Sequence, residues 1–320
     1  MDAKTWTAVR DLMHILMLLF LAAAFLFVLT WTNTIKCKAI PGWCDVYYTI
    51  AGEPRVAIVF GDEGMGDPDL LQLILADPRK AGIHASLFHI DTVSPGTLKN
   101  YKLVIVEKAR KISSEKIKMF MDYASTGGRL VWTGDAGTQA DPEDFLYKDE
   151  ASADTNEHTR INAWARKHKG FVVNFNEFLS VDYLGNYCSV KPCSKQNVTC
   201  SGSLNFPDSR NPMTFGLISA RSMCFVPGAD YSLTKLVVAN SSTVAATIDY
   251  QGSLIGENES YGNNAPIIVT TAKSNFYGSK VGETVAYYAI PPEYLADPSL
   301  PDEMRFPTIV EDMYYGMLFG

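Results

Sequence analysis

The sequence predicts a three-layer α/β/α domain built on a mostly parallel sheet and preceded by one N-terminal transmembrane helix. Two observations predict it. Short apolar runs alternate with amphipathic segments from residue 55 onward, and an uncharged apolar run lies near the N-terminus. The chain has 320 residues, 47% of them hydrophobic, which suffices for a sizeable core. Its net charge of −7, with no basic stripe, argues against nucleic acid as a partner.

The apolar run from Leu12 to Trp31 carries no formal charge and has the length that a helix needs to cross a bilayer. Trp6 and Trp31 flank it, as aromatic residues do at membrane interfaces. The alternative is a cleavable signal peptide, but the sequence TWTNTIKCK that follows is a poor cleavage site. We expect an uncleaved anchor. The expected organisation is a cytoplasmic segment 1–11, a transmembrane anchor 12–33, a stalk 34–54 and a main domain 55–320.

The cysteines and glycosylation sequons indicate which side of the membrane the domain occupies, because the flanking lysines and arginines are balanced. All six cysteines follow the anchor, which favours disulfides in an oxidising space. They are Cys37, Cys44, Cys188, Cys193, Cys200 and Cys224. Three N-x-[ST] sequons begin at Asn197, Asn240 and Asn258. We expect a cell-membrane protein with an extracytoplasmic domain; the alternative is a cytosolic domain with free thiols.

Cysteine spacing leaves the pairing open. Cys37 and Cys44 flank a Pro-Gly pair and could form a local loop, and residues 186–225 look like an insertion stapled by disulfides. No zinc pattern is present, because the later cysteines lack C-x2-C spacing and nearby histidines. We therefore expect no metal and no cofactor.

Each element of the domain has its own signal. Val56–Phe60 is a continuous apolar run, and Asp67-Pro68 and Ser113 are helix starts. A glycine pair at 127–128 ends the second helix. Further strands are expected at 84–91, 102–109, 129–134, 170–175, 235–240, 244–250, 265–271 and 283–290, with helices at 159–169 and 308–320.

The order of these pieces resembles the class I glutamine amidotransferase-like fold, a flavodoxin-like architecture. Enzymes of that family carry a G-x-C-x-G-x-Q nucleophile elbow after the fourth strand; here the segment reads TGDAGTQ, with Gly137 and Gln139 matching and Asp135 in place of the cysteine. The family's terminal His-Pro-Glu triplet corresponds to Pro-Pro-Glu ending at Glu293. The segment NPMTFGL, starting at Asn211, resembles a His-Pro-x-x-x-Gly-Leu segment of non-amidase branches, including trehalose-utilisation-type proteins.

The resemblance implies that the amidase chemistry is lost, because glutamine hydrolysis by this route needs a thiolate activated by an imidazole. Asp135 and Glu293 occupy the degenerate nucleophile and acid positions. As a nucleophile, Asp135 would still need a water-activating partner, for which His158 or His168 are candidates. The alternative is that Asp135 caps the helix that follows the elbow.

Ligands of open α/β sheets bind at the carboxyl ends of the strands. Candidate ligand-binding residues at that edge are Gly61, Asp62, Glu63, Gly64, Asp91, Asp135 and Gly137. The glycine-rich turn 61–66 lies beside Asp67, and the carboxylates around it oppose a phosphate. The turn is either a plain turn over the sheet edge or, with Asp135, a site for a polyhydroxyl ligand or a hard divalent cation.

The function expected from the sequence is a single-pass, catalytically inactive, amidotransferase-like binding or scaffolding module for a partner protein or glycan. The alternative is a surface hydrolase that acts on carbohydrate or peptide through Asp135, Glu63 and Glu293. Six tyrosines could form a sugar-stacking surface or could simply pack in the core. They are Tyr183, Tyr187, Tyr287, Tyr288, Tyr314 and Tyr315.

Overall fold

The computed structural model divides the chain into two compact units, Met1–Glu53 and Pro54–Leu318, which are described separately. The residues that it describes are 3–31, 35, 40–52, 54–77, 82–141, 163–168, 171–208, 211–214, 216–219, 221–237, 242–256, 260–271 and 284–319. The expected sites Cys37, Asn240 and Asn258 and the side chain of Cys44 lie outside this set.

The first unit consists of two helices, α1 (Ala3–Trp31) and α2 (Trp43–Ala51). Within α1, the 22-residue span Arg10–Trp31 contains an 18-residue stretch with a mean hydropathy of 2.8, and the span is long and apolar enough to cross a membrane. A membrane anchor and a signal sequence both have these properties. Helix α2 forms where a stalk was expected. It packs against the end of α1, because Trp43 Nε1 donates to Thr30 Oγ1 at 2.8 Å.

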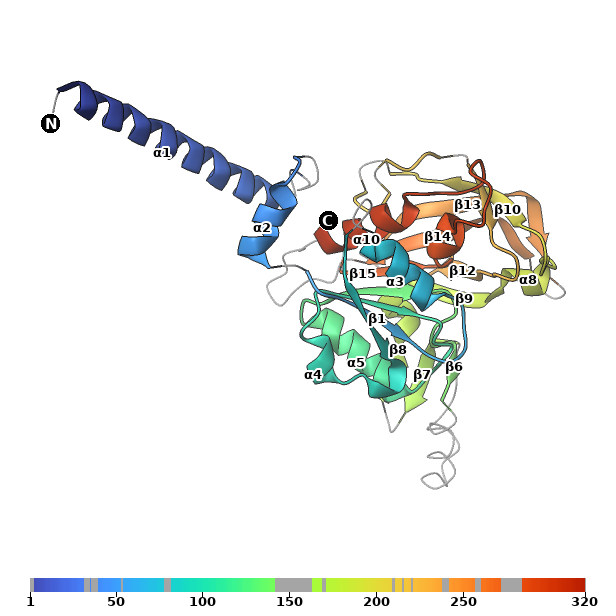
Figure 1. Ribbon diagram of the computed structural model, residues 1–320. Coiled ribbons are helices and arrows are strands. Elements are labelled where there is room, and N and C mark those ends of the chain that lie inside the picture. The colour runs from blue at the N-terminus through green and yellow to red at the C-terminus, as the bar shows by residue number, and fades with distance from the viewer. Residues whose placement is uncertain are drawn as a thin grey trace. The chain divides into compact units, whose positions relative to one another are not determined.

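The second unit contains a nine-stranded mixed sheet, of which the five strands β15, β5, β3, β1 and β2 run parallel. The remaining four strands pair antiparallel at the far end of the sheet from β1 (Figure 1). In sheet order, the strands are β11 (Arg221–Phe225), β10 (Thr199–Asn205), β13 (Ser242–Ile255), β14 (Ser260–Thr271), β15 (Val285–Tyr288), β5 (Arg129–Thr133), β3 (Leu103–Glu107), β1 (Val56–Phe60) and β2 (Ala85–His89). The α/β class is thus confirmed, while the three-layer arrangement stays a prediction.

The core of this unit lies along the parallel strands. In β1 and β3, the residues from Val56 to Val59 and from Leu103 to Val106 are buried, as strands covered on both faces should be. Ile58 is in register with Ile105 on β3 and with Leu87 on β2.

Helices α3 (Pro68–Ala76) and α5 (Ser114–Ser125) begin where the sequence predicts. Asp67 Oδ1 accepts from the Leu70 amide at 3.1 Å, and Ser113 Oγ accepts from the Lys116 amide at 3.3 Å. These caps satisfy amides that have no partner within the helix. The shorter elements are β4 (Lys111–Ile112), β6 (Gln139–Ala140), β7 (Ala165–His168), β8 (Phe171–Asn174), β9 (Val181–Asn186), β12 (Ser232–Leu236), α4 (Pro95–Leu98), α7 (Phe175–Leu179), α8 (Tyr187–Val190), α9 (Glu293–Ala296), α10 (Ile309–Phe319) and a 3-10 turn (Ile90–Thr92).

In the middle of the domain, one expectation was wrong and another had shifted bounds. The helix expected at 159–169 is not formed over residues 165–168, which make β7 and pair antiparallel with β8 outside the central sheet. The reason is tertiary: the buried Arg166 guanidinium donates to Ile112 O at 2.6 Å and to Gln139 O at 3.0 Å. The strand expected at 235–240 is present as β12, but it begins earlier, at Ser232, ends at Leu236 and pairs with β9; residues 238–240 lie outside the described set.

Two disulfides lie in the segment 186–225, as expected. Cys188 is bonded to Cys193, and Cys200 is bonded to Cys224. Cys200 and Cys224 are facing residues on the antiparallel strands β10 and β11, so the second bond joins neighbouring strands at the end of the sheet. These disulfides fit an oxidising, extracellular environment for the domain.

Candidate functional site

The segment that resembles a nucleophile elbow forms a tight turn directly after β5. Gly134 and Gly137 have φ of 58° and 67°, which glycine tolerates and other residues resist. Over residues 135–141, the described stretch after the turn, the chain forms no helix and continues into β6 at Gln139. The expectation that Asp135 caps a following helix was therefore wrong.

The Asp135 carboxylate is buried and both of its oxygens are engaged. Oδ1 accepts a hydrogen bond from the Met65 amide at 2.8 Å, and Oδ2 lies 2.6 Å from Arg110 Nε. Met65 belongs to the glycine-rich turn after β1, and Arg110 belongs to the loop after β3. Asp135 thus ties together the loops that follow three neighbouring strands of the parallel sheet.

The carbonyl groups of the elbow are also held in place. Ala136 O accepts from Nε1 of both Trp132 and Trp164, each at 2.8 Å. Gly137 O accepts from the Arg166 guanidinium. Buried polar groups with such partners cannot reorient without leaving a donor or acceptor unsatisfied. The elbow is therefore fixed by internal contacts.

The glycine-rich turn uses its amides in the same way. The amides of Gly61, Gly66 and Asp67 donate to Lys108 O at 3.2 Å, to the Tyr294 hydroxyl at 2.8 Å and to Glu293 Oε1 at 3.0 Å, respectively. A Cβ added at Gly64 would lie 3.0 Å from backbone atoms of the loop after β3. Amides that cradle a phosphate point at the ligand, whereas these three donate within the protein.

The carboxylates expected to form a ligand site do not converge. The Asp62 side chain is 91% exposed and lies 3.4 Å from His89 Nε2, while Asp91 contacts Nδ1 of the same ring at 3.3 Å. Glu63 pairs with Lys111 at 3.0 Å. Since Asp135 faces Met65 and Arg110, the described residues bring no cation site together at the turn.

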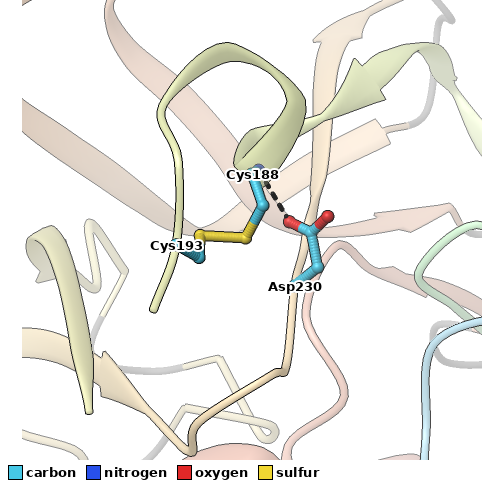
Figure 2. Close-up of side chains that lie close together, drawn as sticks. All are labelled: Cys188, Cys193 and Asp230. Carbon is cyan, nitrogen blue, oxygen red and sulfur yellow. Dashed lines mark hydrogen bonds between the residues drawn. A yellow bond between two sulfur atoms is a disulfide. The ribbon is translucent and has the colours of Figure 1, made fainter. Parts of the chain in front are cut away.

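Among the described residues, one group has the spacing of metal ligands: Cys188, Cys193 and Asp230 (Figure 2). The two sulfurs are bonded to each other, so neither is a thiolate that could ligate a metal. Asp230 Oδ1 accepts from the amides of Cys188 at 2.9 Å and of Tyr231 at 2.8 Å. This group serves to fix the loop at α8.

Two buried glutamates lie close together behind the glycine-rich turn, a pairing that the sequence did not reveal. Glu107 ends β3 and Glu293 begins α9, and both are fully buried. No donor from the described residues reaches either oxygen of Glu107 or Oε2 of Glu293. A hydrogen bond between the two carboxyl groups therefore requires that one of them carry a proton.

The pKa values of these glutamates agree with a shared proton. Burial and the neighbouring Glu293 raise the pKa of Glu107 well above its usual range. Burial raises the pKa of Glu293 to about 7, and the hydrogen bond from the Asp67 amide opposes that shift. Both shifts favour the protonated form of at least one of these buried carboxyl groups.

Histidines do not meet the elbow among the described residues. His84 is exposed, His89 lies beside Asp62 and Asp91, and neither is hydrogen-bonded to Asp135. His158 and the side chain of His168, the two candidate partners, lie outside the described residues. Asp135, Glu63 and Glu293 thus have separate local partners.

Two adjoining cavities open on the second unit, the larger beside the loops after β3 and β5 and the smaller over the antiparallel strands β10, β11 and β13. The larger has a volume of about 940 Å³ and is bordered by Arg110, Gln139 and Tyr183. The smaller, of about 440 Å³, is bordered by Tyr187, Tyr250 and Lys191. Val190 and Ile255 line both cavities. Neither cavity is lined by Asp135, Glu107 or Glu293.

The six tyrosines divide between core and surface. Tyr187, Tyr287, Tyr288, Tyr314 and Tyr315 are buried. Tyr183 is half-buried and borders the larger cavity. They do not form one stacking surface, because most of their ring area packs inside the domain.

Comparison with known proteins yields only distant structural similarity. No protein-family model matches the chain, and no curated protein matches it in sequence. A ThuA-like protein from Bacteroides uniformis ATCC 8492 is 12% identical and has a TM-score of 0.48, over 83% of this chain and 92% of that one. The N-terminal domain of mmIFT52 is 12% identical, with a TM-score of 0.46 over 82% and 98% of the two chains. ThuA-like proteins are glutamine amidotransferase-like.

The same kind of similarity extends to parts of larger enzymes. The cold-adapted β-galactosidase from Rahnella sp. R3 is 14% identical and has a TM-score of 0.45, over 86% of this chain but 33% of the enzyme. At such identity and TM-score, none of these similarities carries a conclusion about activity.

Proposed function

We propose that this protein is a single-pass membrane protein whose extracytoplasmic, three-layer amidotransferase-like domain acts as a catalytically inactive binding or scaffolding module for a partner protein or glycan. The observation that carries the proposal is the engagement of Asp135. Its carboxylate holds Met65 and Arg110 in fixed positions, and it is buried away from both cavities. A nucleophile needs access to substrate and an activating base.

The second candidate is a surface hydrolase, and one observation favours it. Carboxyl groups with strongly raised pKa values gather at catalytic sites, and Glu107 and Glu293 are such a pair. Against this candidate, both glutamates are fully buried and line neither cavity. Substrate would reach them only if the glycine-rich turn, which Asp135, Tyr294 and Glu293 hold down, moved away.

Hydrolysis assays on the full-length chain in mild detergent separate these candidates. The substrates are glutamine, peptide amides and nitrophenyl glycosides, and the proteins are the wild type and Glu293→Gln. We expect rates at the no-protein background for both. Turnover by the wild type that disappears in Glu293→Gln, while folding is retained, would establish the hydrolase and refute the module.

The orientation of the anchor has a separate test. Asn197 is exposed and belongs to a sequon in the described part of the domain. If the domain is extracytoplasmic, the protein expressed in a eukaryotic host should lose one glycan in Asn197→Gln, seen as a mobility shift that glycosidase treatment abolishes. If the protein carries no glycan, and added protease digests the domain only from the cytoplasmic side of the membrane, the proposed topology is wrong.

A further inference from the structure

The larger cavity lies where ligands of α/β sheets bind, at the carboxyl ends of the parallel strands. Arg110 reaches it from the loop after β3, and Gln139 reaches it from the segment after β5. Its volume of about 940 Å³ is within the range of small-molecule sites.

The charge of both cavities contrasts with that of the protein. The net charge of the chain is −7, yet neither cavity is lined by an aspartate or glutamate from the described residues. Arg110 lines the larger cavity and Lys191 lines the smaller. Asp135 neutralises the charge of Arg110, so the argument from charge rests on Lys191 and on the lack of carboxylates in both described linings, which favour an anionic ligand over a cationic one.

The Arg110 guanidinium is fixed in position and partly exposed to the larger cavity. Its Nε is bound to the buried Asp135 at 2.6 Å, and its side chain is 32% exposed. Its two terminal nitrogens, Nη1 and Nη2, make no hydrogen bond to any residue in the described ranges. A guanidinium fixed through Nε presents these two nitrogens as a fork, the geometry that pairs with a carboxylate.

Asn186 supplies a second donor on the same wall. The Tyr183 hydroxyl donates to Asn186 Oδ1, which fixes the amide so that its NH2 group is left as the free end. That NH2 group has no hydrogen-bond partner among the residues with described positions. Arg110 and Asn186 thus each make one hydrogen bond inside the protein, through Nε and Oδ1 respectively, and offer their remaining N–H donors to a ligand.

The smaller cavity continues this surface. It shares Val190 and Ile255 with the larger one, and the rings of Tyr187 and Tyr250 stack at 6.1 Å along its wall. The Tyr187 ring is itself buried, so this wall offers a ligand mainly hydroxyl and amide groups, which can donate hydrogen bonds to sugar hydroxyls and accept them.

We infer that the two cavities bind an acidic oligosaccharide containing uronic acids, with one sugar carboxylate on Arg110 and the chain continuing toward Lys191. This inference rests on the proposed function and names its ligand and site. Hydroxyl and amide groups outnumber apolar side chains on both walls, which favours a saccharide over an acidic peptide.

The test uses the full-length protein in an uncharged detergent and measures binding by calorimetry. The probes are galacturonate, glucuronate and mannuronate oligomers, each paired with its neutral methyl ester. We expect at least one acid oligomer to bind, its ester to bind at least tenfold more weakly, and added salt to weaken the acid form. Equal binding of acid and ester, no binding of any acid, or binding of an acidic peptide in preference to every uronate would overturn the inference.

Variants locate the site. Arg110→Lys keeps the charge but removes the fork, and we expect about tenfold weaker binding. Arg110→Gln/Asp135→Asn removes the ion pair without leaving a buried charge, and binding should be lost while the fold is kept. Lys191→Gln should weaken binding of long oligomers and leave that of a monomer unchanged. Lys118→Gln is the control, because it removes one exposed positive charge on α5. Unchanged binding in the double variant would overturn the inference.

This outcome is separable from that of the proposed function. Hydrolysis of a bound oligosaccharide would refute the inactive module and leave the site in place. Binding of a neutral glycan or a protein that is insensitive to Arg110 would refute the site and leave the module in place.

Discussion

Arg110 Nε lies 2.6 Å from Asp135 Oδ2, and the two partners differ in their exposure: 32% of the arginine side chain is accessible, against 1% of the aspartate. The pair joins the loop after β3 to the turn after β5. The aspartate therefore serves the fold, while the arginine is shared between the fold and the cavity surface.

Removing only the arginine should destabilise the domain. Arg110→Gln leaves a buried carboxylate with a single donor, and we expect a loss of about 1–3 kcal/mol in the free energy of unfolding. The double variant Arg110→Gln/Asp135→Asn leaves no charge unpaired. Its loss in the free energy of unfolding should therefore be smaller than the sum of the losses in Arg110→Gln and Asp135→Asn. Urea unfolding followed by tryptophan fluorescence checks this, because Trp132 and Trp164 are buried at the elbow. Strict additivity would show that the pair contributes nothing.

The glutamate pair should make stability depend on pH. The pKa values of Glu107 and Glu293 are raised by folding, so between pH 4.5 and about 7 the folded protein binds more protons than the unfolded chain. The contribution of the pair is therefore most favourable below pH 4.5 and is lost as the pH rises through 7. One such proton changes the free energy of unfolding by about 1.4 kcal/mol per pH unit.

Glu107→Gln tests this dependence. Its amide can donate to Glu293 Oε2 without titrating, so the variant should be more stable than the wild type at pH 8 and should show a flatter pH profile. Glu63→Gln, which alters an exposed partner of Lys111, is the control and should retain the wild-type slope. A profile for Glu107→Gln that is as steep as that of the wild type would contradict the shared proton. Unfolding at several pH values is the measurement.

Gly66 is the residue of the glycine-rich turn that lies against the side chain of Glu107. Its φ is 122°, and an added Cβ would lie 3.0 Å from the Cβ of Glu107. We expect Gly66→Ala to cost about 1–3 kcal/mol, because both the backbone conformation and the contact oppose a side chain. Gly96→Ala is the matched control, since its nearest neighbour would be Ser94 Oγ at 3.8 Å. Thermal unfolding of both variants measures the difference. If Gly66→Ala is as stable as Gly96→Ala, the turn can move to accommodate the added methyl group.

How far the sequence predicts this molecule depends on the range of the interactions. Asp67 and Ser113 were predicted as caps and act as caps, because capping joins residues three apart. The apolar runs of β1 and β3 were likewise predicted, since a strand buried on both faces needs no polar alternation. These features depend on local chemistry.

What the sequence did not predict depends on partners far along the chain. Arg166 holds β7 extended through carbonyls of distant segments, so its local pattern was read as a helix. The role of Asp135 became visible only with Met65 and Arg110 placed beside it. The pairing of Glu107 with Glu293 had no signal in either neighbourhood. Spacing alone does not bring such residues together.

The two disulfides should contribute unequally to stability, because they close loops of different length. Cys200 and Cys224 are separated by 24 residues, and Cys188 and Cys193 by 5. Loop-closure entropy in the unfolded chain predicts losses of about 3.5 kcal/mol for Cys200→Ser/Cys224→Ser and about 2 kcal/mol for Cys188→Ser/Cys193→Ser. Chemical denaturation of the two double variants under identical conditions measures the difference. In Cys188→Ser/Cys193→Ser, Asp230 can still accept a hydrogen bond from the backbone amide of residue 188, which should further limit the loss of stability. If Cys188→Ser/Cys193→Ser proved the less stable of the two, its disulfide would stabilise the loop at α8 by more than the loop-closure entropy alone.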